Sequence, residues 1–240
     1  MIIDEVQENK CVEELRKLVK DLEQNDGTLR RFLRARNHDV VKAEDMLRKT
    51  IEWRKANKCD EALTWKIDDL IIQKFPIEYT GVDLKNRAVL YIPVGTWPVR
   101  EMLEKGHREE MLKYIYVCLE KLIQEIEKTG DQFTMIVDLE DMTYWKVAHY
   151  ETIQMTIKVF RDFEANYPER LGEALVINAP LVLNYVWPLV KPLLTGSTLK
   201  KVQFLGSSCA KYLPAILTYM PAASLSGKLE NLMLVNKISH

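Results

Sequence analysis

Residues 166–194 read NYPERLGEALVINAPLVLNYVWPLVKPLL. Within this stretch, residues 175–177 form a short apolar run with the composition of a buried strand, and the Asn178-Ala179-Pro180 that follows is typical of a turn. Over residues 181–194 nearly every position is apolar. We therefore predict a buried strand, a turn and an unusually apolar helix in direct succession.

This apolar stretch is too short to span a membrane. Residues 174–190 carry no charge, but they fall short of the roughly 20 residues that a bilayer requires, and Lys191 closes the run. Pro180 and Pro188 also interrupt it. We therefore expect two separate elements here, a strand and a helix.

A helix that is apolar on all sides is either buried in the core or faces something apolar that is not protein. Pro180, Pro188 and Pro192 delimit the segment 181–194 and weaken its backbone hydrogen bonding, which favours a mobile gate over a core helix. The residues that we expect to form this gate are Leu181, Val182, Tyr185, Val186, Trp187, Leu189, Val190, Leu193 and Leu194.

Short apolar runs alternate with long amphipathic helices after residue 67. The runs cover residues 88–92, 134–137, 174–177 and 202–205, and helical periodicity covers residues 107–128 and 146–165. Strands joined by helices of this length need crossover connections. We predict an α/β fold with a mostly parallel sheet and flanking helices.

The N-terminal residues have the pattern of a separate helical unit. Apolar residues recur at helical spacing up to Leu22, and Asn25-Asp26-Gly27 interrupts them. Two further helices follow, the second with Asp39 placed as its N-cap. We predict a helical subdomain over residues 1–60 and a larger domain over residues 67–240.

The composition excludes several classes of protein. The 240 residues include 34 Lys and Arg against 35 Asp and Glu, a net charge of -1, which argues against a nucleic-acid binder that depends on excess cation. The four cysteines have no CxxC spacing and the four histidines are isolated, so we predict neither a metal site nor another cofactor. The first residues lack a signal-peptide pattern, so we expect a cytoplasmic protein.

The motifs of common enzyme families are missing from the sequence. GxGxxG, GxxxxGK[ST], HExxH and GxSxG do not occur. Ser207 and Ser208 have no activating base nearby in the sequence, and the cluster of Asp138, Glu140 and Asp141 is more typical of a solvated loop. We predict no catalytic residue and a protein that is not an enzyme.

A series of motifs resembles the CRAL-TRIO lipid-binding family. The C-terminal part contains NYPERL at 166–171, VINAP at 176–180, LVKPLL at 189–194 and KVQFLG at 201–206. The N-terminal part contains LRRFLRAR at 29–36 and EWRK at 52–55. The resemblance spans almost the whole chain, and it implies a sheet that forms the floor of an apolar pocket with residues 181–194 as the gate over its mouth.

The resemblance implies that the pocket holds a lipid. The residues expected to line it are Phe133, Met135, Val137, Phe160, Phe163 and Ile177. Each CH₂ kept out of water is worth about 0.8 kcal/mol, so a long acyl chain does not cross water unaided. The gate would then control the rate of exchange between the protein and a membrane.

The resemblance also implies a headgroup site. In members of the family that bind phosphatidylinositol, the polar contacts fall on positions that correspond here to Glu169, Lys201, Thr198 and Arg36. A lysine can contact a phosphate, and a carboxylate can accept hydrogen bonds from inositol hydroxyls. The alternative for Glu169 and Lys201 is a structural ion pair.

The function implied is a monomeric carrier that transfers or presents one lipid, most closely a phosphatidylinositol, and touches membranes transiently through apolar and locally basic contacts. Phe133 and Phe163 stand where relatives that bind phosphatidylcholine place small hydroxyl residues, so the resemblance does not predict phosphatidylcholine binding. Two alternatives remain. One is a carrier for a small hydrophobic molecule such as a tocopherol, a retinoid or a sterol precursor, and the other is a protein-interaction adaptor that transfers nothing.

Overall fold

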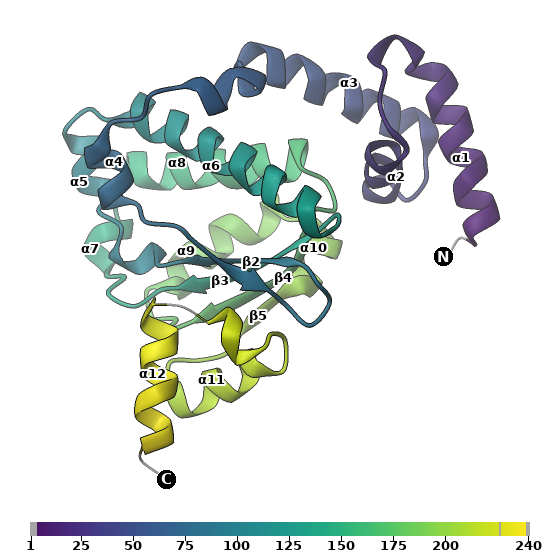
Figure 1. Cartoon of the computed structure of the whole chain (residues 1–240). Helices are drawn as coiled ribbons and strands as arrows, with labels where there is room; N and C mark the ends of the chain where they lie inside the picture. Colours follow the sequence, from purple (N-terminus) through teal and green to yellow (C-terminus); the bar gives the residue numbers. More distant parts are fainter. Residues whose placement is uncertain (1–3, 226, 239–240) are drawn as a thin grey trace.

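The computed structural model of the chain describes residues 4–225 and 227–238. A sheet lies at the centre, with helices on both of its faces and a helical N-terminal arm above it (Figure 1). The helices are α1 Glu5–Leu18, α2 Asp26–Ala35, α3 Val40–Ala56, α4 Asp69–Lys74, α5 Val99–Glu104, α6 Arg108–Thr129, α7 Tyr144–Val147, α8 Tyr150–Asn166, α9 Leu183–Val190, α10 Gly196–Lys201, α11 Cys209–Leu217 and α12 Gly227–Ile238. Short 3₁₀ helices cover Lys20–Leu22, Cys59–Thr64, Val94–Thr96, Lys191–Leu193 and Ala222–Ser224.

The N-terminal helices begin at polar caps and share a small core. Asp4, Asn25 and Asp39 each accept a hydrogen bond from a backbone N–H in the first turn of α1, α2 and α3, which confirms the cap predicted at Asp39. Buried apolar residues from all three helices pack together, among them Leu15, Leu29 and Leu47. This arm therefore has its own hydrophobic cluster.

The strands form one sheet in the order β1-β2-β3-β4-β5 within the described residues. They are β1 Glu78–Val82, β2 Ala88–Ile92, β3 Phe133–Asp138, β4 Leu171–Ile177 and β5 Val202–Phe204. Strands β2 to β5 are parallel, as predicted, and β1 pairs with β2 in the antiparallel direction. We did not predict β1, an edge strand whose residues are alternately half-buried and exposed and whose pairing shifts register next to Gly81.

Helices α6 and α8 are the main crossover helices between the parallel strands. Helix α6 agrees with the prediction, but the single helix predicted over residues 146–165 is wrong. Two helices, α7 and α8, stand there instead, because His149 takes an extended conformation with φ -138° and ψ 128°. The ring Nδ1 of His149 lies 3.1 Å from the hydroxyl of Thr152, a contact that holds this break in place.

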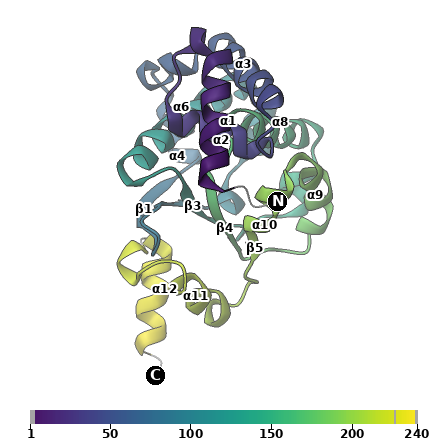
Figure 2. The same cartoon turned by 90° about the vertical axis from the view of Figure 1, so that its right-hand side faces the viewer.

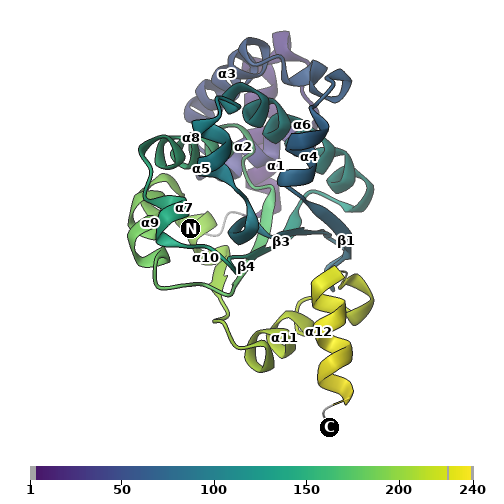
Figure 3. The same ribbon diagram turned by 90° about the vertical axis from the view of Figure 1, so that its left-hand side faces the viewer.

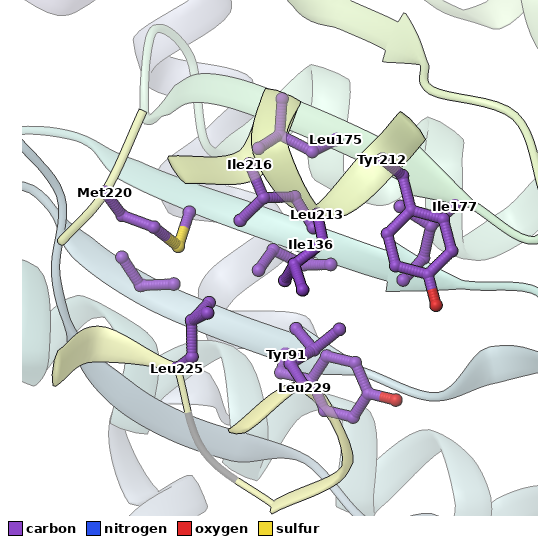
Figure 4. Packing of buried hydrophobic residues seen from close by; sticks show 11 residues of the cluster. Tyr91, Ile136, Leu175, Ile177, Tyr212, Leu213, Ile216, Met220, Leu225 and Leu229 are labelled. Carbon is purple, nitrogen blue, oxygen red and sulfur yellow. The ribbon is translucent and has the colours of Figure 1, made fainter. Parts of the chain in front are cut away.

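The sheet has an apolar layer on each face. On the face covered by α6 and α8, Leu90 and Phe133 pack with Ile126. On the opposite face, α11 and α12 cover Ile136 and Leu175 (Figure 4). The two layers confirm an α/β fold with helices on both faces of a mostly parallel sheet.

The apolar segment 181–194 is shorter as a helix than we predicted. Helix α9 spans eight residues with Pro188 inside it, and the 3₁₀ turn Lys191–Leu193 follows. The correction has a physical cause, because Pro192 lacks the N–H that a continuing helix would use and the chain becomes extended at Leu194. The segment that we expect to form the gate is therefore a short helix and a turn.

Candidate functional site

A cavity of about 640 Å³ lies where the end of α2, the end of α8 and helix α10 meet. In Figure 2, α10 lies below the N-terminal helices and beside β5. The four residues that the sequence nominates for a headgroup, Arg36, Glu169, Thr198 and Lys201, all line this cavity. The fold therefore brings together residues that lie up to 165 positions apart in the sequence.

The turn between α8 and β4 positions Glu169. This residue has φ +56°, a left-handed conformation that is uncommon outside glycine. Its carbonyl accepts a hydrogen bond of 3.2 Å from Gln132 Nε2, and the next carbonyl, of Arg170, accepts one of 2.9 Å from the N–H of Phe133. The backbone contacts on both residues hold the Glu169 side chain at the cavity wall.

Glu169 is bonded at both of its carboxylate oxygens. Lys201 Nζ donates to Oε2 over 3.1 Å, and the hydroxyl of Ser197 donates to Oε1 over 3.2 Å. The side chains of Lys201 and Glu169 are 19% and 21% exposed. The ion pair that we considered from the sequence is thus present, at the cavity wall.

Helix α10 carries the other polar residues of this wall. Thr195 caps the helix, and its Oγ1 accepts a hydrogen bond of 3.2 Å from the N–H of Thr198. The hydroxyls of Thr195 and Thr198 lie 3.0 Å apart. Lys200 and Lys201, in the last turn, both line the cavity, as do Ser197 and Thr198, so α10 contributes two hydroxyls and two cations.

Two of the cavity's cations have no ion pair among the residues that the structure describes. The guanidinium of Arg36 donates from Nη1 to the carbonyl of Ala35 over 3.0 Å, and Lys200 is exposed. Arg34 differs, because its Nε and Nη2 donate to Glu8 over 2.7 and 2.8 Å. Arg36 and Lys200 therefore place positive charge at the cavity that forms no ion pair with a described carboxylate.

Glu8, on α1, holds the arginines of α2 in place. It binds Arg34, Arg30 and His38, and its side chain is 12% exposed. The hydrogen bonds from Arg34, with smaller effects from His38 and Arg30, lower the pKa of Glu8 from 4.5 to about 2 against the opposing effect of burial. The carboxylate thus stays charged and keeps Arg34 at the edge of the cavity.

Sequence reasoning missed several residues of the cavity. Ser197 and Lys200 are sequence neighbours of residues predicted to bind the headgroup, and Arg34 lies inside the LRRFLRAR motif. The position of each in the sequence could therefore have indicated the cavity. No sequence feature indicated Glu164, because a glutamate within a predicted amphipathic helix is ordinary. It lines the cavity all the same, and its Oε1 is buried without a hydrogen-bond partner in the part of the chain that is described.

Five of the six residues expected to line an apolar pocket come from α8 and from the sheet face that α6 and α8 cover. Phe133 and Phe163 pack edge to face with ring centroids 6.1 Å apart, and Met135 joins the same cluster. Val137 follows Met135 by two positions and so shares its face. Phe160 lies on α8 and is 36% exposed.

Ile177 is the exception, and its expected position is corrected. The register pairs Ile177 with Asp138, one position beyond Val137, so its side chain points to the opposite face. There it is fully buried in the cluster beneath α11, near Tyr212 (Figure 4). Ile177 therefore cannot share a pocket with Met135 and Val137.

Helix α9 buries one side and exposes the other. Val182 and Val190 are buried, and Trp187 packs edge to face on Phe204 of β5 with centroids 5.1 Å apart. Leu181 and Tyr185 are 84% and 69% exposed. The segment is therefore apolar on a surface that the described protein does not cover.

Helix α7 extends this exposed apolar area. Figure 3 shows α7 beside α9, and the rings of Tyr144 and Tyr185 meet edge to face at 6.1 Å. Trp145 is 66% exposed, and the guanidinium carbon of Arg100 lies 3.3 Å from its ring centroid. We call Tyr144, Trp145, Tyr150, Leu181 and Tyr185 the aromatic surface, and each is more than half exposed.

No helix within the described ranges is long and apolar enough to cross a bilayer. Among the same residues, no group of three or more His, Cys, Asp or Glu side chains is arranged to hold a metal ion.

A mostly parallel sheet covered by helices on both faces, with a polar cavity at its edge and a short, partly exposed apolar helix beside it, defines a class of α/β domain. The CRAL/TRIO domain model matches residues 73–229, and the CRAL/TRIO N-terminal domain model matches residues 3–49. The chain belongs to the CRAL/TRIO family, whose members bind small lipophilic ligands and are generally carriers. The boundaries at residues 1–60 and 67–240 stay a prediction.

Individual relatives support the assignment. A CRAL-TRIO domain-containing protein of Caenorhabditis elegans is 32% identical over 195 residues, which cover 77% of this chain and 27% of that protein. Protein real-time of Drosophila melanogaster is 28% identical over 231 residues, which cover 90% of this chain and 34% of the relative. The chain thus spans about a third or less of the length of these curated relatives.

The fold has a solved counterpart. The crystal structure of Sfh5 superposes with a TM-score of 0.70 at 16% identity, covering 85% of this chain and 82% of that one. At this level of identity the likeness shows a common fold.

Proposed function

We propose that this chain carries one phosphatidylinositol-like lipid, with its headgroup in the cavity at Arg36, Glu169, Thr198 and Lys201. The observation that supports this most directly is the meeting of these four residues in one cavity, where Arg36 forms no ion pair with any residue that the structure describes. A ligand phosphate would supply the missing counter-charge. A guanidinium is well suited to a phosphate because it offers several donors in a fixed plane.

The ion pair of Glu169 and Lys201 fits a headgroup that carries both phosphate and hydroxyls. A ligand phosphate can accept from Lys201 and from the hydroxyl of Thr198, while Glu169 accepts from ring hydroxyls in place of one of its present donors. The pair is already partly exposed, so the exchange would not bury an unpaired charge. The same two residues can thus serve as an ion pair without a ligand and as contacts with one.

The acyl chains would lie against the sheet face that carries Phe133, Met135 and Val137, with Phe163 of α8 as a wall. Met135 and Val137 are only partly buried although they point from the centre of a sheet. Helix α9 would be the gate, with Trp187 as its hinge contact on Phe204. Because the pocket and a bilayer are similarly apolar, the exchange is nearly balanced and gate opening would limit its rate.

The aromatic surface would make the transient membrane contact. Tyr and Trp are enriched at membrane interfaces because their rings are apolar and their N–H or O–H groups stay in the headgroup layer. The net charge of -1 argues for brief contact, since tight adhesion to anionic lipid needs clustered cations. A cytoplasmic location and a monomeric state stay predictions from the sequence.

A carrier of a small hydrophobic molecule is the second candidate, and one observation favours it. Phe133 and Phe163 pack against each other and fill space near the middle of the expected pocket. A tocopherol, retinoid or sterol precursor needs less room than a lipid with two acyl chains. The four polar residues at the cavity have no evident role in that case, which favours the phospholipid.

Mass spectrometry of the purified protein after organic extraction tests the proposal. We expect a phosphatidylinositol in roughly equimolar amount, together with transfer of labelled phosphatidylinositol between vesicles. A prenoid or sterol in its place would favour the second candidate. A protein that arrives empty and takes up neither class of ligand from vesicles would contradict both and favour an adaptor.

A further inference from the structure

Glu164 has an unmet hydrogen-bonding requirement beside the headgroup cavity. Its Oε1 is buried and has no hydrogen-bond partner in the described part of the chain. Glu164 also lines the cavity. Leaving a carboxyl oxygen buried and unpaired costs free energy, so a donor that enters the cavity would be bound favourably once the side chain turns toward it.

Glu164 differs in this respect from the other carboxylate of the cavity. Glu169 is already occupied by Lys201 and Ser197. Glu164 forms no ion pair within the described residues, although Arg36 and Lys200 line the same cavity and are unpaired too. Glu164 on α8 therefore has an unpaired acceptor oxygen that a turn of its side chain would bring to the cavity, and unpaired cations stand on two other walls. A single ligand that carries both hydroxyl donors and an anionic phosphate would satisfy all of them.

We propose that Glu164 determines headgroup specificity by accepting a ring hydroxyl of the inositol and disfavouring a phosphate at that place. A phosphomonoester carries a charge of about -1.5 to -2 near neutral pH and offers acceptor oxygens, so it would repel a carboxylate that needs a donor. The diester phosphate, held by Arg36 and α10, is common to every phosphatidylinositol. Glu164 thus selects unphosphorylated phosphatidylinositol over ring-phosphorylated forms. This inference rests on the proposed function.

Binding of dioctanoyl phosphatidylinositol and of its 4-phosphate, measured by isothermal titration calorimetry, tests the inference. We expect the wild-type chain to bind the unphosphorylated lipid more tightly. Glu164→Gln should reduce that preference by about tenfold, because an amide can donate to a phosphate as well as accept from a hydroxyl. Glu151→Gln, an equal change of charge at an exposed position on the same helix, should leave the preference unchanged.

A purely structural role for Glu164 would change the melting temperature and not the ratio of the two affinities. If Glu164 mainly supports the fold, Glu164→Gln lowers the melting temperature and leaves the ratio of the two affinities as it was, which overturns the inference. We expect a melting temperature no lower than that of the wild type, because Glu164 is half-buried and its buried Oε1 has no hydrogen-bond partner to lose within the described residues. Should Glu164→Gln fail to fold, Glu164→Ala measured in the same way gives the ratio.

The inference and the proposed function fail in distinguishable ways. A wild-type chain that binds both lipids equally well, or prefers the 4-phosphate, overturns the role of Glu164 while phosphatidylinositol binding stands. A wild-type chain that binds neither lipid overturns the proposed function, and the inference with it.

Discussion

Lys201 at the end of α10 donates to Glu169 over 3.1 Å and joins two segments that lie 32 residues apart in the sequence. Between them run β4, helix α9, which we propose as the gate, and the 3₁₀ turn that follows it. The pair therefore ties together the two ends of the segment that carries the proposed gate. A headgroup bound at the wall of the cavity would, under our proposal, contact this pair and so act on the gate.

Replacing Lys201 tests the headgroup assignment. We expect Lys201→Ala to slow phosphatidylinositol transfer between vesicles by about tenfold, because a charge-assisted hydrogen bond to the phosphate is lost. Stability should fall by no more than about 1 kcal/mol, since the pair is partly exposed. Lys211→Ala, on the exposed side of α11, removes the same charge elsewhere and should have no effect. Transfer at the wild-type rate by Lys201→Ala would rule out this assignment.

Replacing Trp187 tests the gate. Trp187→Asp places a charge at the contact with Phe204 and on the apolar segment, so we expect it to block uptake of every lipid. Circular dichroism should show an unchanged helical content. Trp187→Phe keeps an aromatic ring at the contact and should retain most of the transfer. Normal uptake by Trp187→Asp would exclude the gate role of α9.

Replacing two residues of the aromatic surface tests membrane contact. We expect Tyr144→Ser combined with Trp145→Ser to reduce co-sedimentation with vesicles several-fold, since both rings would lie at the membrane interface. The matched control is Leu84→Ser, because Leu84 is 64% exposed at the connection between β1 and β2, and Trp145 is 66% exposed. Equal loss of binding in both proteins would indicate a non-specific effect of surface polarity. Unchanged binding by the double variant would place the contact elsewhere.

Glu8 makes stability depend on acid pH. Because Arg34 lowers its pKa from 4.5 to about 2, the stability that Glu8 contributes is fully present above about pH 4.5 and is lost as the pH falls toward 2. We expect urea denaturation to show Glu8→Gln less stable than the wild type at pH 7, with the difference shrinking between pH 4.5 and 2. Glu14→Gln, exposed on the same helix, should show no such trend. A difference that stays constant with pH would contradict the role of Glu8.

Local patterns predicted the elements that depend on local chemistry. The cap at Asp39 and the strand Ala88–Ile92 agree with the sequence, because a capping side chain and a continuous apolar run act over a few residues. Strand β1 escaped prediction because its apolar residues Tyr79 and Val82 lie three positions apart, so its sequence lacks the apolar alternation of a half-buried strand. The break at His149 escaped because apolar periodicity continues across it.

The sequence by itself determined the class of fold and, through the resemblance of its motifs, the four residues nominated for a headgroup. Only the tertiary structure decided that these four line one cavity, that Glu164 lines it with an oxygen unpaired among the described residues, and that Ile177 lies on the far face of the sheet. The physical reason is that apolar periodicity shows which side of an element is buried, while crossover connections and strand register decide what that side meets. Charge balance at a cavity depends on residues from α1, α2, α8 and α10 at once, and no local pattern contains that information.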